Sequence, residues 1–188
     1  MIPEVKAVIF VKNSERLPGK HLMEICGEPM VRRIYRNIES TGLFDYIVIY
    51  SKYSELAVEG CNVERDQTTG TLIDSILSSI KLHGEFLAVG GDMPFLGADL
   101  ISRLVKEYDG RPLSVVDSDG TVEPLLSIYN PSIFDDLYES SRHSKEIYRF
   151  IRERFVLLEL EQDESSELFN VNTQEDLNEA RRMANCPK

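Results

Sequence analysis

Two cations stand close together in a short polar loop near the start of the chain. Arg16 and Lys20 flank Pro18 and Gly19, shortly after the apolar run of residues 7–11. The backbone N–H groups of such a loop can turn toward an anion, and the two side chains add positive charge. We therefore expect a phosphate site here, with an ordinary surface loop that contains two cations as the alternative.

Oxygen-bearing side chains farther along the chain could complete such a site. Asp92 follows an apolar run and two glycines, where a carboxylate can hold Mg²⁺ or cap the next turn. Asn170 and Asn172 alternate along an extended segment, so both side chains should point the same way. They predict further oxygen ligands for the metal, with turn chemistry before a helix as the alternative. Glu123 is a weaker candidate, either for binding an acceptor substrate or for beginning a strand.

The remaining polar residues give less specific signals. The loop of residues 66–70 could hold an anion or the edge of a base, or it could simply cap the following helix. His21, His83 and His143 are isolated in the sequence, and we predict no catalytic role for them. The three cysteines, which are Cys26, Cys61 and Cys186, are far apart, odd in number and without metal-binding spacing. We expect reduced thiols and a cytoplasmic protein.

Length and charge limit the classes of function. The 188 residues predict one domain, residues 1–188, and 42% hydrophobic content is ordinary for a globular protein. The net charge of −11 repels nucleic acid and anionic membranes, so we expect neither as a partner. Neither a signal peptide nor an apolar run of about 18 residues, as a membrane helix requires, is expected. No pattern predicts an oligomeric state.

The hydrophobic pattern predicts alternating strands and helices. Strands are expected over residues 5–11, 46–51, 61–64, 85–90, 113–116, 123–129 and 155–160, and helices over 29–40, 54–58, 71–82, 96–108, 131–139, 144–154 and 173–183. This order implies an α/β fold of three layers, in which helices cover both faces of a mostly parallel sheet. Ligands of such sheets bind beyond the carboxyl ends of the strands. The polar loops described above are therefore expected to converge at one edge.

Four short blocks together resemble a known family. They are SERLPGK at 14–20, GDMP at 91–94, EPLL at 123–126 and NVNTQEDL at 170–177. Their order and spacing resemble the nucleotidyltransferases with a GT-A-like (nucleotide-diphospho-sugar-transferase-like) fold, specifically the molybdenum cofactor guanylyltransferase (MobA-like) family, over nearly the whole chain.

The resemblance implies roles for individual residues. It implies that Arg16 and Lys20 bind the nucleotide phosphates and that Asp92 holds Mg²⁺, so that these three residues carry catalysis. Asn170 and Asn172 match the second part of the metal site, and Asp66 falls where such enzymes contact the base or sugar.

The first loop departs from the family pattern. The family has Leu-Ala-Gly-Gly after the first strand, where glycines let the backbone lie against the nucleotide. Here the sequence is Phe-Val-Lys-Asn, so Val11 and Asn13 stand at nucleotide-binding positions. Asn13 tolerates unusual backbone angles better than Val11 does. This departure leaves the preference between GTP and CTP open.

The implied reaction moves a nucleoside monophosphate from an NTP to a small phosphorylated acceptor and releases pyrophosphate, with Mg²⁺ as cofactor. GTP is the favoured donor and molybdopterin the favoured acceptor. Cobinamide phosphate is an alternative acceptor, since GTLID at 70–74 is similar to archaeal cobinamide-phosphate guanylyltransferases. A sugar acid with CTP is another, since ERLPGK at 15–20 resembles the sugar-acid cytidylyltransferases. A non-catalytic nucleotide-binding protein on the same fold is the competing class.

Overall fold

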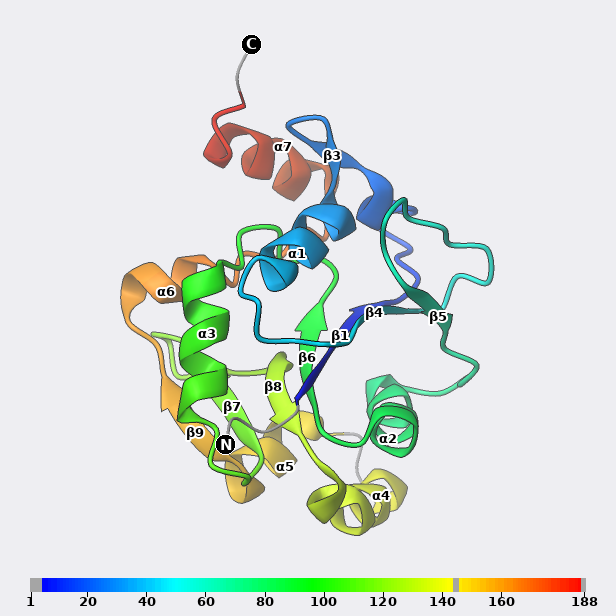
Figure 1. The fold of residues 1–188 in the computed structure, drawn as a ribbon, viewed down its shortest axis with the longest axis vertical. Coiled ribbons are helices and arrows are strands. Elements are labelled where there is room, and N and C mark those ends of the chain that lie inside the picture. The colour runs from blue at the N-terminus through cyan, green and yellow to red at the C-terminus, as the bar shows by residue number, and fades with distance from the viewer. Residues whose placement is uncertain (1–4, 144–145, 187–188) are drawn as a thin grey trace.

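A seven-stranded sheet forms the middle layer of the computed structural model, which describes residues 5–143 and 146–186 (Figure 1). In spatial order its strands are β5 (Val63–Arg65), β4 (Ile47–Ser51), β1 (Lys6–Val11), β6 (Phe86–Gly90), β8 (Val122–Tyr129), β7 (Leu113–Val116) and β9 (Val156–Glu159). The strands β5, β4, β1 and β6 are parallel, β8 is antiparallel to both of its neighbours, and β7 pairs with β9 in parallel. The mostly parallel α/β sheet predicted from the sequence is confirmed.

The antiparallel strand follows from the length of one connection. Only residues 117–121 separate β7 from β8, and a parallel crossover needs a dozen or more residues. The Asp117 N–H donates to the carbonyl of Thr121, and Gly120 takes a φ of 80°, so the chain reverses within one tight turn. The reversal leaves the end of β8 that carries Glu123 beside the carboxyl end of β6.

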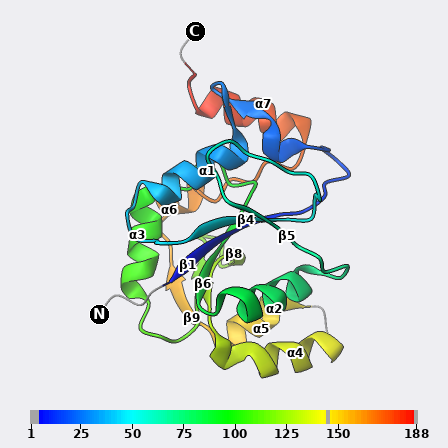
Figure 2. The same cartoon turned by 45° about the vertical axis from the view of Figure 1, so that its right-hand side comes forward.

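Helices cover both faces of the sheet (Figure 2). One face carries α1 (Met30–Glu39), α3 (Ala98–Glu107), α6 (Gln162–Ser166) and α7 (Gln174–Met183), and the other carries α2 (Leu72–His83), α4 (Phe134–His143) and α5 (Ile147–Arg154). Alternate residues of β1 serve the two cores, because Ile9 packs with the first group and Phe10 with the second. Burial on both faces explains why the parallel strands are continuous apolar runs.

Several short elements differ from the sequence predictions. Residues 54–55 form a turn and residues 56–58 have no regular structure, where a helix was predicted. A 3₁₀ helix, η1 (Lys20–Leu22), a two-residue hairpin of β2 (Glu24–Ile25) and β3 (Glu28–Pro29), and α6 were not predicted. The hairpin turns at Cys26 and Gly27, which both have positive φ, as its tight geometry requires. A second 3₁₀ helix, η2 (Pro131–Ile133), precedes α4, and the predicted helix start at residue 144 lies outside the described residues.

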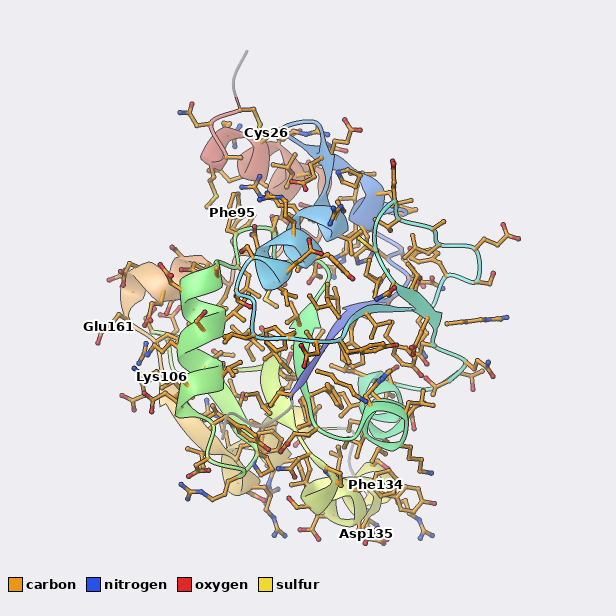
Figure 3. All side chains as sticks on the ribbon, in the orientation of Figure 1. Cys26, Phe95, Lys106, Phe134, Asp135 and Glu161 are labelled. Atoms are coloured by element: carbon orange, nitrogen blue, oxygen red, sulfur yellow. A yellow bond between two sulfur atoms is a disulfide. The ribbon has the colours of Figure 1, made fainter. Side chains whose placement is uncertain are left out.

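The cysteine prediction was wrong. Cys26 and Cys186 form a disulfide across 160 positions, while Cys61 is a free thiol. The reason is tertiary, because α7 returns to the hairpin and brings the two Cα atoms to 5.0 Å. Cys26 is labelled in Figure 3 at the end of the molecule that α7 occupies. Among the described residues, no helix is both long and apolar enough to cross a bilayer.

Candidate functional site

Three loops meet around the Lys20 ammonium at the carboxyl edge of the sheet. Its Nζ donates to Asp92 Oδ2 at 2.8 Å, to the carbonyl of Val171 at 2.8 Å and to Asn172 Oδ1 at 2.9 Å. The lysine residue is only 3% exposed, so its charge is almost fully removed from bulk water. The predicted convergence of these loops is confirmed for Lys20, Asp92 and Asn172.

The first loop holds Lys20 in place through local backbone structure. Gly19 has a φ of 70°, a left-handed conformation that lets the chain enter η1. The Leu17 N–H donates to Ser14 Oγ, and the Leu17 side chain is buried in the core. The loop is therefore anchored on both sides of Pro18, and Lys20 starts η1 with its side chain directed inward.

The turn that carries Asp92 has no space for a larger residue at Gly91. The Gly91 N–H donates to the carbonyl of Phe10, which continues the pairing of β6 with β1. A Cβ on Gly91 would lie 2.8 Å from Val11 Cγ2 and 3.0 Å from the Phe10 carbonyl oxygen. The glycine thus lets the turn lie directly against the end of β1.

The segment before α7 supplies the Val171 and Asn172 oxygens that accept hydrogen bonds from Lys20. The Val171 N–H donates to the carbonyl of Asp92, which fixes the segment against the Asp92 turn. Thr173 and Asp176 form a capping box at the start of α7. Asp176 Oδ2 also accepts from the N–H of Asn172, so this part of the backbone is held at several points.

Asn170 does not join Asn172. Its Nδ2 donates to the carbonyl of Leu168, and within the described residues it forms no hydrogen bond to Lys20 or Asp92. The prediction that the two asparagines act as a pair has no support from these contacts. Strict alternation holds in a regular strand, and this segment has no regular strand structure.

The other predicted loop residues lie at the surface. Arg16 and Asn13 are exposed, and the Arg16 guanidinium forms no ion pair within the part of the chain that the structure describes. Val11 is buried at the end of β1 and lines a cavity of about 90 Å³. An exposed guanidinium beside a buried ammonium gives this loop two different kinds of cation.

Asp66 lies on the wall of the same cavity, in a buried network of polar side chains. Its Oδ2 is 2.9 Å from Lys52 Nζ and accepts from Ser75 Oγ at 2.5 Å, while Oδ1 accepts from Thr68 Oγ1 at 2.7 Å. Burial acts to raise the pKa of Asp66, but the hydrogen bonds from Ser75, Thr68 and Lys52 outweigh it and lower that pKa. The Asp66 carboxylate is therefore charged, and both of its oxygens accept hydrogen bonds. It affects the cavity because two of its partners, Lys52 and Ser75, also line the cavity wall.

Glu123 lies near Asp92 from the opposite side. Its Oε1 accepts from the N–H of Leu125, and the residue is half-buried at the start of β8. Burial raises the pKa of Glu123, and the negative charge of Asp92 raises it further. The Glu123 carboxyl group is thus close enough to Asp92 for the charge of Asp92 to affect its pKa.

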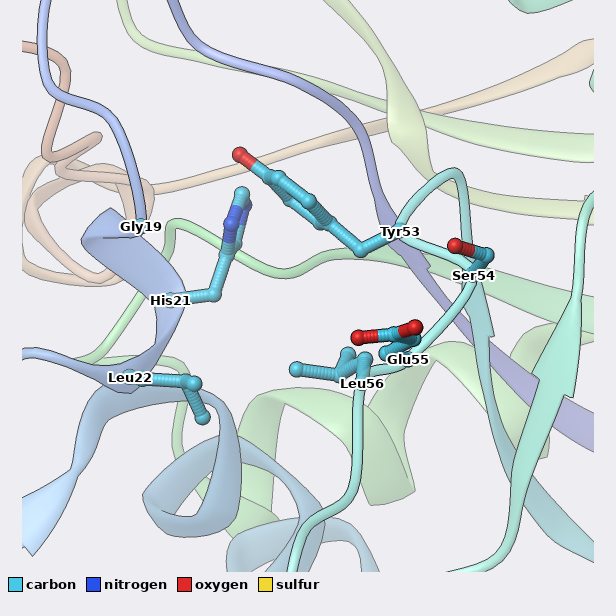
Figure 4. Close-up of a pocket in the computed structure, with 7 residues that line it drawn as sticks. All are labelled: Gly19, His21, Leu22, Tyr53, Ser54, Glu55 and Leu56. Carbon is cyan, nitrogen blue, oxygen red and sulfur yellow. The ribbon is translucent and has the colours of Figure 1, made fainter.

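The buried position of His21 was not predicted from the sequence. The residue is 2% exposed and separates the Asp92 turn from a cavity of about 340 Å³, since its Cδ2 would lie 3.1 Å from a Cβ on Gly91. Figure 4 shows His21 and Tyr53 reaching into this cavity from opposite sides. Burial and the Lys20 charge lower the pKa of His21 to about 4, and among the described residues its Nδ1 has no hydrogen-bond partner. Only the neighbouring Lys20 could have drawn attention to this histidine.

The oxygens around Lys20 suit a hard cation. A carboxylate, an amide and a backbone carbonyl all point at one positive charge, which here is the Lys20 ammonium. Mg²⁺ prefers such oxygens and usually takes only one or two carboxylates from a protein, with waters and phosphates filling its other positions. No cluster of three His, Cys, Asp or Glu side chains suited to a metal occurs among the described residues. The set therefore fits Mg²⁺ held jointly with a phosphate ligand.

Comparison with known proteins identifies the family of this chain. Residues 13–161 match the family model described as the MobA-like NTP transferase domain. A probable molybdenum cofactor guanylyltransferase of Pyrococcus horikoshii is 32% identical over 92% of this chain and 96% of its own length. A 3-deoxy-manno-octulosonate cytidylyltransferase of Histophilus somni is 22% identical over 77% of this chain and 62% of its own.

The fold also matches solved structures. The molybdopterin-guanine dinucleotide biosynthesis protein A of Archaeoglobus fulgidus superposes with a TM-score of 0.77 over 96% of this chain and 99% of that chain, at 20% identity. The chain belongs to the MobA-like NTP transferase family and is a nucleotidyltransferase.

Proposed function

We propose that this nucleotidyltransferase moves GMP from GTP to molybdopterin, with Mg²⁺ as cofactor and release of pyrophosphate. The observation that carries the proposal is the convergence of Asp92, Asn172 and the Val171 carbonyl on the Lys20 ammonium. The choice of GTP and molybdopterin is supported by the names of the relatives, including the Pyrococcus horikoshii protein at 32% identity.

In the proposed step, a phosphate oxygen of the acceptor attacks the α-phosphorus of the nucleotide in line. A new P–O bond forms as the bond to the β-phosphate oxygen breaks, and pyrophosphate leaves with the electron pair. A phosphate oxygen is already ionised near neutral pH, so the protein needs no strong general base. Its task is to position the reactants and to neutralise charge.

Each cation of the first loop has a separate part in this task. Arg16 is exposed and without an ion-pair partner among the described residues, so it is free to pair with the leaving pyrophosphate. Lys20 is buried beside Asp92 and neutralises the phosphate oxygens closest to that carboxylate. When bound, Mg²⁺ would supply Lewis-acid charge neutralisation at the phosphates, held by Asp92 and Asn172.

The cavity at the ends of β1 and β4 is the proposed place of the nucleoside. Phe10 and Val11 form one wall, Leu72 and Leu125 add apolar surface, and Lys52 and Ser75 bring donors. Its volume of about 90 Å³ is small for a purine, so the surrounding loops must part when a base enters. Glu123, at the start of β8 near Asp92, is the proposed contact for the acceptor.

Transfer of CMP to a sugar acid is the second candidate. The cytidylyltransferase of Histophilus somni supports it, as does the small cavity, which would fit a pyrimidine with less movement. A sugar hydroxyl is not ionised at neutral pH, so this reaction would require a base or a metal to activate it. His21 is only 2% exposed and its pKa is lowered to about 4, which disfavours it as that base.

Thermal unfolding with GTP, CTP, ATP and UTP, each with and without Mg²⁺, tests the donor. A ligand at about 100 times its Kd adds roughly 2.7 kcal/mol, which raises Tm by very roughly 5–10 °C for a chain of this size. We expect GTP to raise Tm by this amount when Mg²⁺ is present and not when Mg²⁺ is absent. A shift with CTP alone would favour sugar-acid transfer, and no shift with any nucleotide would refute an NTP-dependent enzyme.

Release of pyrophosphate tests catalysis separately from binding. We expect release from GTP in the presence of molybdopterin and Mg²⁺, and none without acceptor. Release with cobinamide phosphate and not with molybdopterin would reassign the acceptor. Nucleotide binding without release for molybdopterin, cobinamide phosphate or a sugar acid would identify a non-catalytic nucleotide-binding protein.

A further inference from the structure

The disulfide ties the far end of α7 to the segment that carries Lys20. Cys26 lies four residues after the end of η1, and Cys186 lies three residues after the end of α7. At the other end of α7, Thr173 is the N-cap and Asn172 precedes it beside the Lys20 ammonium. The same helix is therefore joined to residues 20–29 at both ends, covalently at one and by hydrogen bonds at the other.

A second contact reinforces the covalent end. Arg181 Nε donates to the carbonyl of Glu24, which is in the same hairpin as Cys26. Both sulfur-bearing residues are accessible, since Cys26 is exposed and Cys186 is half-buried. An accessible disulfide can undergo thiol–disulfide exchange, whereas one shielded in the core cannot.

The surface around the disulfide is hollow and presents two guanidinium groups. Cys26, Cys186, Arg181 and Arg182 line a depression of about 580 Å³, and Glu24 is the acidic residue among the described residues that line it. Arg182 pairs with Glu179 on its own helix and Arg181 is exposed, so both guanidiniums lie at the surface. Guanidinium groups recognise carboxylates through charge-assisted hydrogen bonds.

We propose that this depression is a docking site for a low-molecular-weight thiol that carries carboxylates, and that exchange at Cys26–Cys186 releases the end of α7. A thiolate of the small molecule attacks one sulfur and forms a mixed disulfide, and the other cysteine leaves as a thiolate and takes a proton from water. A second small thiol attacks the mixed disulfide. The protein disulfide is reduced to two thiols, and two small thiols become one small disulfide.

Release of α7 has a defined consequence for the site. The core still holds Leu177 and Ala180 of α7, so the helix stays in place as a whole. Its contacts with the hairpin become reversible, and the segment at Asn172 opens more often. Oxidation would thus favour the arrangement in which Asn172 and Asp92 are held on Lys20.

The first test measures exchange, with glutathione as the anionic probe and 2-mercaptoethanol as the neutral one. It uses the Cys61→Ser background, so that only the disulfide pair reacts with an alkylating label read by mass. We expect Arg182→Gln to slow reduction by glutathione several-fold and to leave the rate with mercaptoethanol unchanged, because the lost charge acts only on carboxylates. Arg149→Gln, another exposed arginine paired with a glutamate of its own helix, is the control. Equal rates in all three proteins, or no reduction by glutathione, would overturn the docking site.

The second test measures hydrogen exchange at the amides of Val171, Asn172 and Thr173 without nucleotide, so its outcome does not depend on the function proposed above. We expect these amides to exchange about tenfold faster after reduction, because the segment opens locally more often. The double variant Cys26→Ser with Cys186→Ser should behave like the reduced protein under all conditions. Unchanged exchange at these amides on reduction would overturn the link between the disulfide and the site.

Discussion

Lys20 Nζ and Asp92 Oδ2 lie 2.8 Å apart although 72 positions separate the two residues in the chain. The lysine side chain is 4% exposed and the aspartate side chain 18% exposed, so the pair is largely shielded from water. Two further oxygens, from Val171 and Asn172, complete the surroundings of the ammonium. The free protein thus holds a cation of its own among the oxygens that we propose for Mg²⁺.

Asp92→Asn keeps an oxygen for Lys20 and removes the negative charge. We expect turnover to fall by about 10²–10³-fold, the typical effect of deleting one group that stabilises charge in a transition state. Stability should fall by only about 1–2 kcal/mol, because the hydrogen bond to Lys20 can persist. Pyrophosphate release and urea unfolding provide the two measurements. Asp99→Asn, an exposed aspartate of α3, is the control, and near wild-type turnover of Asp92→Asn would contradict the mechanism.

Lys20→Met removes the ammonium and leaves the three oxygens without a cation. We expect Mn²⁺, used as a probe for Mg²⁺, to bind the nucleotide-free variant about tenfold more tightly, since two positive charges no longer compete for one site. Turnover should nevertheless fall, because Lys20 no longer neutralises phosphate. Electron paramagnetic resonance of free Mn²⁺ gives the affinity. Lys106→Met, at an exposed position, serves as the control, and an unchanged Mn²⁺ affinity in Lys20→Met would show that the ammonium and the metal occupy different places.

Gly91→Ala places a methyl group where the backbone of β1 lies. The new Cβ would be 3.0 Å from the Phe10 carbonyl oxygen, and a backbone atom cannot move aside cheaply. We expect a loss of about 1–3 kcal/mol in the free energy of unfolding, as overpacking typically produces. The Asp92 turn should also shift and lower turnover. Gly97→Ala is the matched control, because its Cβ would meet only the carboxylate end of Glu167. Equal stability of the two variants would refute this packing argument.

The buried His21 makes stability depend on pH. Its pKa is lowered to about 4 in the folded protein, from 6.5 in an unfolded chain. As the pH falls from 6.5 toward 4, His21 becomes protonated in the unfolded chain and stays neutral in the folded protein. The free energy of unfolding therefore falls over this pH range. The loss approaches about 1.4 kcal/mol for each pH unit. Unfolding by urea at several pH values should show a shallower dependence in His21→Gln. His143→Gln, at an exposed histidine, should retain the wild-type dependence.

Much of the fold could be predicted because its signals are local. The apolar runs of β1, β4, β6 and β7 and the Thr173–Asp176 capping box each depend on residues within a few positions. The hairpin at Cys26–Gly27 was missed because its strands are only two residues long and contain no hydrophobic pattern. The disulfide could not be predicted, since it depends on where α7 packs.

Some residues of the candidate site could likewise be predicted from the sequence, and others could not. Asp92 and Lys20 could be predicted because each follows a strand at the carboxyl edge, where the fold class itself places ligands. The alternation that pairs Asn170 with Asn172 assumes a regular strand, and the segment is irregular, so the contacts of the two side chains differ. His21 was missed because burial between a turn and a cavity is a property of the packed molecule, which neighbours in sequence do not reveal.

The contact between Lys20 and the Val171 carbonyl spans 151 positions, which has a consequence for synthesis in the cell. At about 5–20 residues per second, a ribosome needs roughly 8–30 s to proceed from one residue to the other. During that time the first loop, and later Asp92, emerge without the segment that completes their surroundings. The contacts of Lys20 are therefore incomplete until residues 171 and 172 leave the ribosome, and a message truncated before that point would yield a protein that lacks part of the candidate site.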